Sequence, residues 1–141
     1  MIKKSVCVSF DYTTDKHLRF LLWAWNEREH IPFSFNDVTP SEIQSKDYGV
    51  VKLVLSRKIN EAEYLLVLVG KYANRRAWDS DQIGDINWMN WEINKAKGLG
   101  KKLIGVKTER EYDSPTALLG SNVTWAYALT VDSVSKALRE V

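Results

Sequence analysis

The stretch Tyr64–Val69 is an unbroken run of apolar side chains that ends at Gly70. A short apolar run closed by glycine is typical of a strand that is buried on both faces, as in parallel sheets. The chain has 141 residues, of which 45% are hydrophobic and 27% are charged, as expected for one globular domain. We therefore expect a single domain over residues 1–141, with this run as its central strand.

Stretches with strand character alternate with stretches of helical periodicity along the whole chain. We expect strands over residues 5–10, 33–37, 64–69, 102–106 and 125–129. We expect helices that end near 26, cover about 50–61, run from 88 to Gly98 or Gly100, and begin at 131. This alternation predicts an α/β three-layer sandwich with about five parallel strands. The flavodoxin-like order 2-1-3-4-5 fits best, because it places the most apolar strand at the centre.

This strand order also predicts where a ligand binds. In such a sheet, ligands bind at the carboxyl ends of strands one and three, where the winding reverses. The loop Phe10–Asp15 follows the first strand, and the segment leading to Glu92 follows the third. Both segments therefore leave the same edge of the sheet, and we expect a crevice there.

Glu92 is an acid in an unexpected position. At about 100° per residue it falls near the centre of an apolar helical stripe formed by Trp88, Trp91, Ala96 and Leu99. A carboxylate that faces the protein is costly unless it is paired or lies in a solvated cleft. We expect the acid to be open to the crevice, whereas pairing with Lys95, Lys71 or a backbone donor is the structural alternative. The residues alone leave both open.

Several classes of function find no support in the sequence. The single Cys7 and the isolated His17 and His30 predict no disulfide and no metal site. A net charge of +2 does not indicate nucleic-acid binding. No apolar run approaches the ~20 residues of a membrane span, and no signal-peptide core is present, so we expect a cytoplasmic protein without membrane contact. Neither the dinucleotide-binding motif G-x-G-x-x-G nor the P-loop motif G-x-x-x-x-G-K-[ST] follows the first strand. A phospho-acceptor receiver domain has its acceptor aspartate at the end of the third strand, where this chain has Val69-Gly70.

The motifs together resemble one known family. The stretch Val6-Cys7-Val8-Ser9-Phe10-Asp11-Tyr12 resembles the first strand and loop of TIR-like domains, and Phe35-Asn36-Asp37 lies where those domains have their second strand. The spacing Trp88-x-x-x-Glu92 resembles the TIR motif with the catalytic glutamate four residues after a tryptophan. With Asn74-Arg75-Arg76 upstream, the chain is most similar to the short TIR-like proteins of bacterial Thoeris anti-phage systems, of the ThsB type.

This resemblance implies an enzyme that cleaves the nicotinamide–ribose bond of NAD. It implies Glu92 as the catalytic residue, with NAD as substrate and no separate cofactor. It further implies an ADP-ribose-derived nucleotide, either linear or cyclic, as a signal to a separate effector protein, and assembly into a homo-oligomer. The implied substrate-binding residues are Phe10, Asp11, Tyr12, Asp37, Asn74 and Trp88.

Each of these residues also has a structural interpretation that the sequence leaves open. Asp11 has the chemistry of a helix cap, and Asp37 that of a turn residue. Trp88 is as well suited to core packing as to stacking on a ligand. Two other functions also stay open: a non-catalytic TIR-like interaction module that uses Phe20, Trp23 and the 38–49 loop, and a nucleoside or nucleotide N-glycosidase of similar fold.

Overall fold

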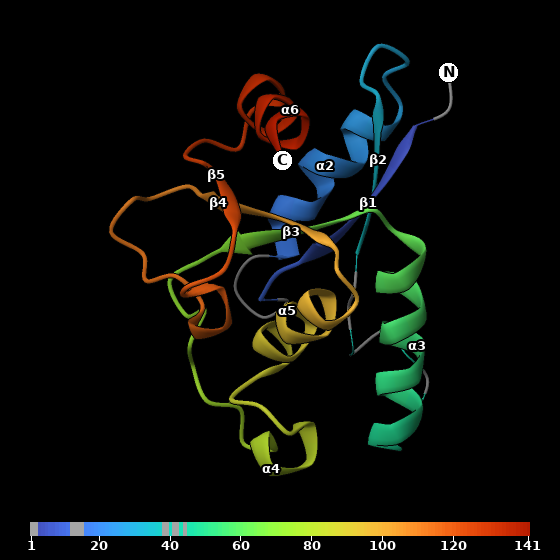
Figure 1. The fold of residues 1–141 in the computed structure, drawn as a ribbon, viewed down its shortest axis with the longest axis vertical. Coiled ribbons are helices and arrows are strands. Elements are labelled where there is room, and N and C mark those ends of the chain that lie inside the picture. The colour runs from blue at the N-terminus through green and yellow to red at the C-terminus, as the bar shows by residue number, and fades with distance from the viewer. Residues whose placement is uncertain (1–2, 12–15, 38–39, 41–42, 44) are drawn as a thin grey trace.

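The computed structural model describes residues 3–11, 16–37, 40, 43 and 45–141. Within this part of the chain five strands form one sheet (Figure 1): β1 (Lys4–Ser9), β2 (Phe33–Asp37), β3 (Tyr64–Val69), β4 (Lys102–Lys107) and β5 (Val123–Ala126). The sheet order is β2-β1-β3-β4-β5, and neighbouring strands pair in parallel. The predicted order is therefore confirmed. All six residues of β3 are buried, as expected for the central strand.

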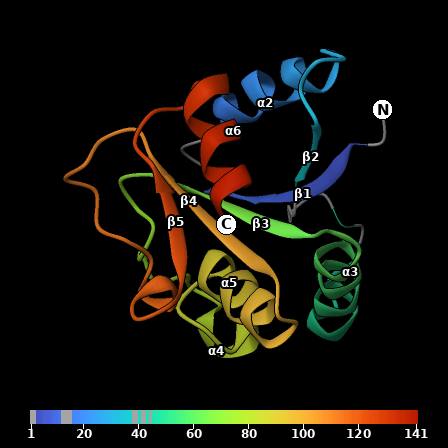
Figure 2. The same ribbon diagram turned by 45° about the horizontal axis from the view of Figure 1, so that its top comes forward.

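Helices cover both faces of the sheet (Figure 2). On one face lie α2 (Arg19–Asn26) and α6 (Val131–Glu140), and on the other lie α3 (Tyr48–Glu61) and α5 (Trp88–Gly98). The alternation of side chains along each strand divides the core accordingly. Val6 and Val8 of β1 pack in the cluster that contains Leu22 of α2, whereas Cys7 packs in the cluster that contains Ile93 of α5.

Shorter elements complete the described chain: η1 (Lys16–Leu18), α4 (Ser80–Ile83) and η3 (Thr116–Leu118). The polar connection over residues 70–87 contains α4. The last strand differs from expectation, because β5 covers 123–126 rather than 125–129. It pairs with β4 from Leu103↔Val123 to Val106↔Ala126, so the ladder ends before Leu129, which packs beside the core instead.

The face of α5 that is buried differs from the predicted stripe. The buried residues are Met89, Asn90, Glu92, Ile93 and Ala96. Leu99 is 37% exposed, and Trp88 and Trp91 lie at the margin of the core. The helix is thus rotated so that Ile93, which is fully buried, faces the sheet. Glu92 stays on the buried side, next to this contact.

No helix of the described residues has the length and apolar character needed to cross a membrane.

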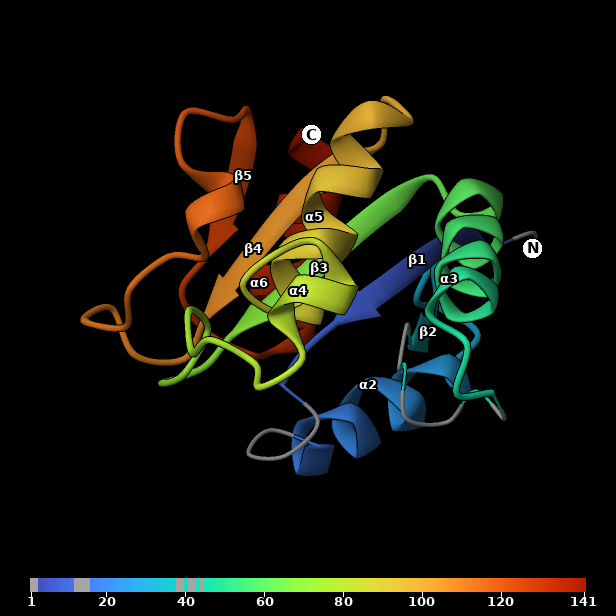
Figure 3. The ribbon, with the colours of Figure 1, turned by 90° about the horizontal axis from the view of Figure 1, so that it is seen from below.

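Figure 3 shows that the arrowheads of the strands point toward one end of the molecule. The carboxyl ends of β1 and β3, the segment with α4 and the start of α5 therefore converge, and the candidate site lies at this end.

Candidate functional site

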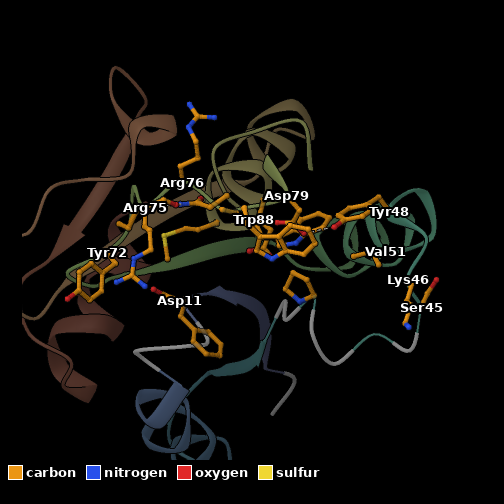
Figure 4. A pocket seen from close by; sticks show the side chains of 18 residues that line it. Asp11, Ser45, Lys46, Tyr48, Val51, Tyr72, Arg75, Arg76, Asp79 and Trp88 are labelled. Atoms are coloured by element: carbon orange, nitrogen blue, oxygen red, sulfur yellow. Dashed lines mark hydrogen bonds between the residues drawn. The ribbon is translucent and has the colours of Figure 1, made fainter. Parts of the chain in front are cut away.

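A pocket of about 810 Å³ lies at the carboxyl ends of β1 and β3 (Figure 4). Its wall comes from Phe10 and Asp11 after β1, from the segments 45–51 and 72–79, and from the first turns of α5. These segments are far apart in sequence and are brought together by the reversal of winding between the strands. The crevice that the sequence predicts is therefore present.

Glu92 lines this pocket from α5, and its neighbour across the helix–sheet contact is Ser9. The Ser9 hydroxyl, on the last residue of β1, donates a hydrogen bond of 2.8 Å to Oε1 of Glu92. Ser9 is fully buried and Glu92 is 1% exposed. The expectation that the carboxylate is open is thus wrong for this structure, because α5 places it on the face that packs toward β1. It borders the pocket but is covered.

The start of α5 is held by Asn87. Its Oδ1 accepts a hydrogen bond of 2.9 Å from the backbone N–H of Asn90, which is a side-chain N-cap. Its Nδ2 donates to the carbonyl oxygens of Ala73 (2.8 Å) and Arg75 (3.0 Å). One side chain therefore joins the helix start to the loop after β3. The position of Glu92, little more than one turn further on, follows from this anchor.

Aromatic rings form one wall of the pocket. The ring of Tyr48, in the first turn of α3, stacks on Trp88 with centroids 6.1 Å apart and an angle of 9° between the planes. The Trp88 ring also meets Trp91 edge to face, with centroids 5.5 Å apart. The Tyr48 hydroxyl donates a hydrogen bond to the Asp79 carboxylate, which raises the pKa of Tyr48 above its ordinary value of 10.0. This bond ties α3 to the segment that precedes α4.

The opposite part of the pocket is cationic. The Arg75 guanidinium carbon lies 3.7 Å from the centroid of the Tyr72 ring, a close cation–π contact. Arg75 points toward Asp11 from the loop after β3 (Figure 4). Arg76 also lines the pocket, and its Nη1 donates to Ser80 at 3.3 Å. The pocket thus combines flat aromatic surface, guanidinium groups and a buried carboxylate.

The predicted site residues are only partly brought together. Phe10, Asp11, Trp88 and Glu92 line the pocket. Asp37 ends β2, next to Val8 in the sheet, and the structure does not describe its side chain. Tyr12 lies outside the described residues. Within the described part of the chain no group of His, Cys, Asp and Glu side chains is arranged to hold a metal ion.

Asn74 does not line this pocket, and its amide serves the loops instead. Oδ1 accepts hydrogen bonds from the N–H of Thr116 (2.8 Å) and from its hydroxyl (3.1 Å), and Nδ2 donates to the carbonyl of Ser114 (2.9 Å). These bonds join the loop after β3 to the segment before β5. The contact of Asn74 with substrate stays a prediction: its amide group is engaged in these bonds, and Asn74 is not among the residues that line the pocket.

Sequence reasoning missed several residues of the site: Ser9, Tyr48, Trp78 and Asp79. A signal existed for Ser9. It is a hydroxyl residue at the end of an apolar strand, and it alternates with Val8 so that it points to the same face as Cys7. A buried hydroxyl on the face covered by α5 indicates a polar partner on that helix.

The parallel β2-β1-β3-β4-β5 sheet, with a pocket at the ends of β1 and β3 where the winding reverses, defines a flavodoxin-like α/β domain with a ligand site at its switch point. The sequence matches the model of the family described as Thoeris protein ThsB, TIR-like domain, over residues 7–113. The chain therefore belongs to this family, and it is a defence-related TIR-like protein.

Solved structures agree on the fold. A prokaryotic SEFIR domain superposes with a TM-score of 0.58 at 15% identity, covering 98% of this chain and 89% of that one. The 2-deoxyribosyltransferase of Bacillus psychrosaccharolyticus superposes with a TM-score of 0.59 at 11% identity, covering 93% of this chain and 90% of that one. The 2-deoxyribosyltransferase of Leishmania mexicana superposes with a TM-score of 0.51 at 10% identity, covering 75% of this chain and 65% of that one. At these identities the likeness extends to the fold alone. Among curated proteins none matches the sequence.

Proposed function

We propose that this chain cleaves the nicotinamide–ribose bond of NAD, with Glu92 as the catalytic residue. The observation that carries the proposal is the carboxylate of Glu92 on the pocket wall, held by Ser9 where β1 and β3 end. The membership in a TIR-like family supports it, as does a pocket that offers both aromatic and cationic groups.

A lone carboxylate is sufficient for this reaction. Glycoside hydrolysis ordinarily needs a general acid, because the leaving group departs as a poor anion, and a second carboxylate for the sugar. The nicotinamide ring of NAD is already cationic, so it takes both electrons of the C–N bond and leaves as a neutral molecule. Positive charge then grows on the ribose, and a carboxylate beside it stabilises that charge. In the proposal, Glu92 has this role and binds the ribose hydroxyls.

The covered position of Glu92 adds a requirement. Since its side chain is 1% exposed, the ribose reaches it only if side chains of the pocket wall shift when substrate binds. Such tightening on binding is common, and catalytic contacts are often incomplete without substrate. Removal of water at the same step strengthens the interaction between the carboxylate and the developing charge.

The other walls of the pocket suit the rest of the dinucleotide. In this proposal Arg75, stacked on Tyr72, binds the pyrophosphate, since a guanidinium donates paired hydrogen bonds to phosphate oxygens. Trp88 and Phe10 contact a planar ring, and Asp11 a ribose hydroxyl. The sugar cation is then captured by water, which gives ADP-ribose, by a nitrogen of adenine, which gives a cyclic product, or by another acceptor. The product is the signal that a separate effector reads.

The test is nicotinamide release from NAD, measured by chromatography for the natural chain and for Glu92→Gln. We expect loss of at least about a hundredfold in rate, because the amide keeps the shape and removes the charge. Glu109→Gln, an exposed acid outside the pocket, is the matched control and should leave the rate unchanged. Equal rates for the natural chain and Glu92→Gln would remove Glu92 from the mechanism.

A second candidate is an N-glycosidase or transferase that acts on nucleosides, which the fold shared with the two 2-deoxyribosyltransferases favours. The same assay with a 2′-deoxynucleoside in place of NAD separates the two. Base release from the deoxynucleoside, without nicotinamide release from NAD, supports this candidate.

The third possibility, an interaction module without turnover, rests on Phe20 of α2, which is 64% exposed, and predicts a partner whose binding is unaffected by Glu92→Gln.

A further inference from the structure

Trp78 is the most exposed of the large apolar side chains that the structure describes, at 91%, and it lines the candidate pocket. An indole normally gains free energy when it is buried. Single exposed apolar residues are common on protein surfaces and call for no special account. Trp78 differs, because it is one of the residues that line a cavity to which the stacked rings of Tyr48 and Trp88 and the guanidinium of Arg75 also belong.

The backbone that carries Trp78 is well anchored. The N–H of Ser80 donates to the carbonyl of Ala77 (3.2 Å), so Trp78 and Asp79 occupy the corner of a turn. The N–H of Ala77 donates to the carbonyl of Ile86 (2.7 Å), which closes the base of the segment. The Asp79 side chain binds the Tyr48 hydroxyl. The indole is therefore presented by a held turn.

The anchoring bond joins Trp78 to the aromatic wall. Asp79, the next residue, contacts the hydroxyl of the same Tyr48 whose ring stacks on Trp88. The residue that follows Trp78 is thus bonded to Tyr48, and Trp78, Tyr48 and Trp88 line the same cavity. Three aromatic residues at one cavity offer a flat ring both stacking and edge contacts, which any nucleobase can use.

The positive charge in the pocket indicates that a ligand with such a ring also carries a phosphate group. Arg75, in the segment before Trp78, lines the same pocket and points toward Asp11, whereas the guanidinium of Arg76 bonds to Ser80 and points away (Figure 4). Guanidinium groups favour phosphate, and the volume of about 810 Å³ lies in the range of sites for small molecules. A base joined through a sugar to phosphate fits both features better than an apolar protein segment does.

We propose that Trp78, together with Tyr48 and Trp88, forms a subsite for the base at the end of NAD that does not react, the adenine. This inference rests on the proposed function for the identity of the whole ligand. In it, Trp78 is a specificity-determining residue: it contacts the base and takes no part in bond cleavage at Glu92.

The first test uses AMP and ribose 5-phosphate as probes, titrated by calorimetry. The two share sugar and phosphate and differ in the base. We expect the natural chain to bind AMP about tenfold or more tighter than ribose 5-phosphate, and Trp78→Ala to lose most of that preference. Ribose 5-phosphate should bind equally to both chains. Trp78→Phe should restore much of the AMP affinity, and Phe20→Ala, which removes an exposed aromatic side chain of α2, should change nothing.

The second test compares turnover of NAD with that of nicotinamide mononucleotide, which lacks the adenosine end. Trp78→Ala should lower kcat/KM for NAD about tenfold and leave that for the mononucleotide unchanged. Equal losses on both substrates would overturn the subsite, as would equal AMP affinity in the natural chain and Trp78→Ala. A changed oligomeric mass in Trp78→Ala with unchanged AMP affinity would assign the indole to a protein contact and also overturn it.

The two proposals can fail separately. If AMP binding depends on Trp78 while no chain releases nicotinamide, the base subsite stands and the NAD-cleaving function falls. If nicotinamide is released in a manner that depends on Glu92 while AMP binding is insensitive to Trp78, the function stands and the subsite is wrong.

Discussion

The hydroxyl of Ser9 donates a hydrogen bond of 2.8 Å to Oε1 of Glu92, and this bond joins the end of β1 to α5 inside the core. Ser9→Ala removes the donor and leaves Oε1 without this bond in a buried place. We expect the free energy of unfolding, measured by urea denaturation, to fall by about 1–3 kcal/mol.

The same variant should also slow nicotinamide release about tenfold with little change in KM, since the carboxylate is no longer aligned. Ser5→Ala is the control, because Ser5 lies on the same strand and is less buried. If both serine variants behave alike, Ser9 has no positioning role.

Tyr48 gives a prediction about pH. Its hydrogen bond to Asp79 stabilises the protonated phenol, so the pKa of Tyr48 is higher in the folded chain than its ordinary value of 10.0. The stability gained from this bond is therefore present below pH 10 and is lost as the pH rises through the folded-state pKa. Tyr48→Phe lacks the bond at every pH.

The measurement is urea unfolding of the natural chain and Tyr48→Phe at pH 8, 9, 10 and 11. The natural chain should be the more stable of the two at pH 8, and the difference should shrink toward pH 11. A difference that stays constant over this range would show that the phenol–carboxylate bond does not contribute.

Among the elements, the pairing of β4 with β5 depends on a glycine. Gly105 lies opposite Trp125, and a Cβ built at Gly105 would lie 2.4 Å from the Trp125 ring. Gly105→Ala therefore forces the indole to move, and we expect a loss of about 1–3 kcal/mol in unfolding free energy. Gly98→Ala is the matched control. A Cβ there meets nothing within 4 Å, and the change in a helix should stabilise by up to about 1 kcal/mol. Similar effects of the two substitutions would contradict the close packing of Trp125.

The loops that border the site give a second prediction at this scale. Asn74 joins the loop after β3 to Ser114 and Thr116, and its bonds are partly open to solvent. Asn74→Ala should lower the unfolding free energy by about 1 kcal/mol and leave the KM for NAD unchanged. A raised KM for NAD in Asn74→Ala without a change in unfolding free energy would show instead that Asn74 contacts the substrate.

How much of these elements could be predicted depends on the length of each signal. The apolar run of β3 and the periodicity of α3 and α5 are long enough to place these elements within about two residues. The helix α4 covers only Ser80–Ile83 in a polar connection, so it has no periodic pattern to detect. The end of β5 depends on its ladder with β4, which local sequence does not encode.

The site was predictable to the extent that topology determines it. The order of the strands placed Phe10, Asp11 and Glu92 at one edge, and the structure brings them to one pocket. Tyr48 and Trp78 come from loops and helix starts, and their place depends on side-chain bonds between segments, such as Tyr48 to Asp79. Glu92 is covered because α5 turns Ile93, rather than the two tryptophans, toward the sheet. The apolar pattern of the sequence favours Trp88 and Trp91 as the buried face, so it does not predict this orientation.

At the scale of the whole molecule, the fold places the ends of β1 and β3, the loop before α4 and the start of α5 around one cavity. The sheet supplies a rigid edge, and the carboxylate is attached to it through Ser9. The segments around this edge carry the aromatic and cationic groups. In the proposed function, dinucleotide binding and the chemistry at the sugar therefore reside in different parts of the chain.

The most direct measurement pairs NAD binding with bond cleavage in one variant. Glu92→Gln is titrated with NAD by calorimetry, and nicotinamide is then measured at a NAD concentration that saturates it. If Glu92 is the catalytic residue, the affinity of the variant for NAD should lie within a few fold of that of the natural chain, and its rate of nicotinamide release should be lower by at least about a hundredfold. Nicotinamide release by the saturated Glu92→Gln chain at the natural rate would contradict this role of Glu92.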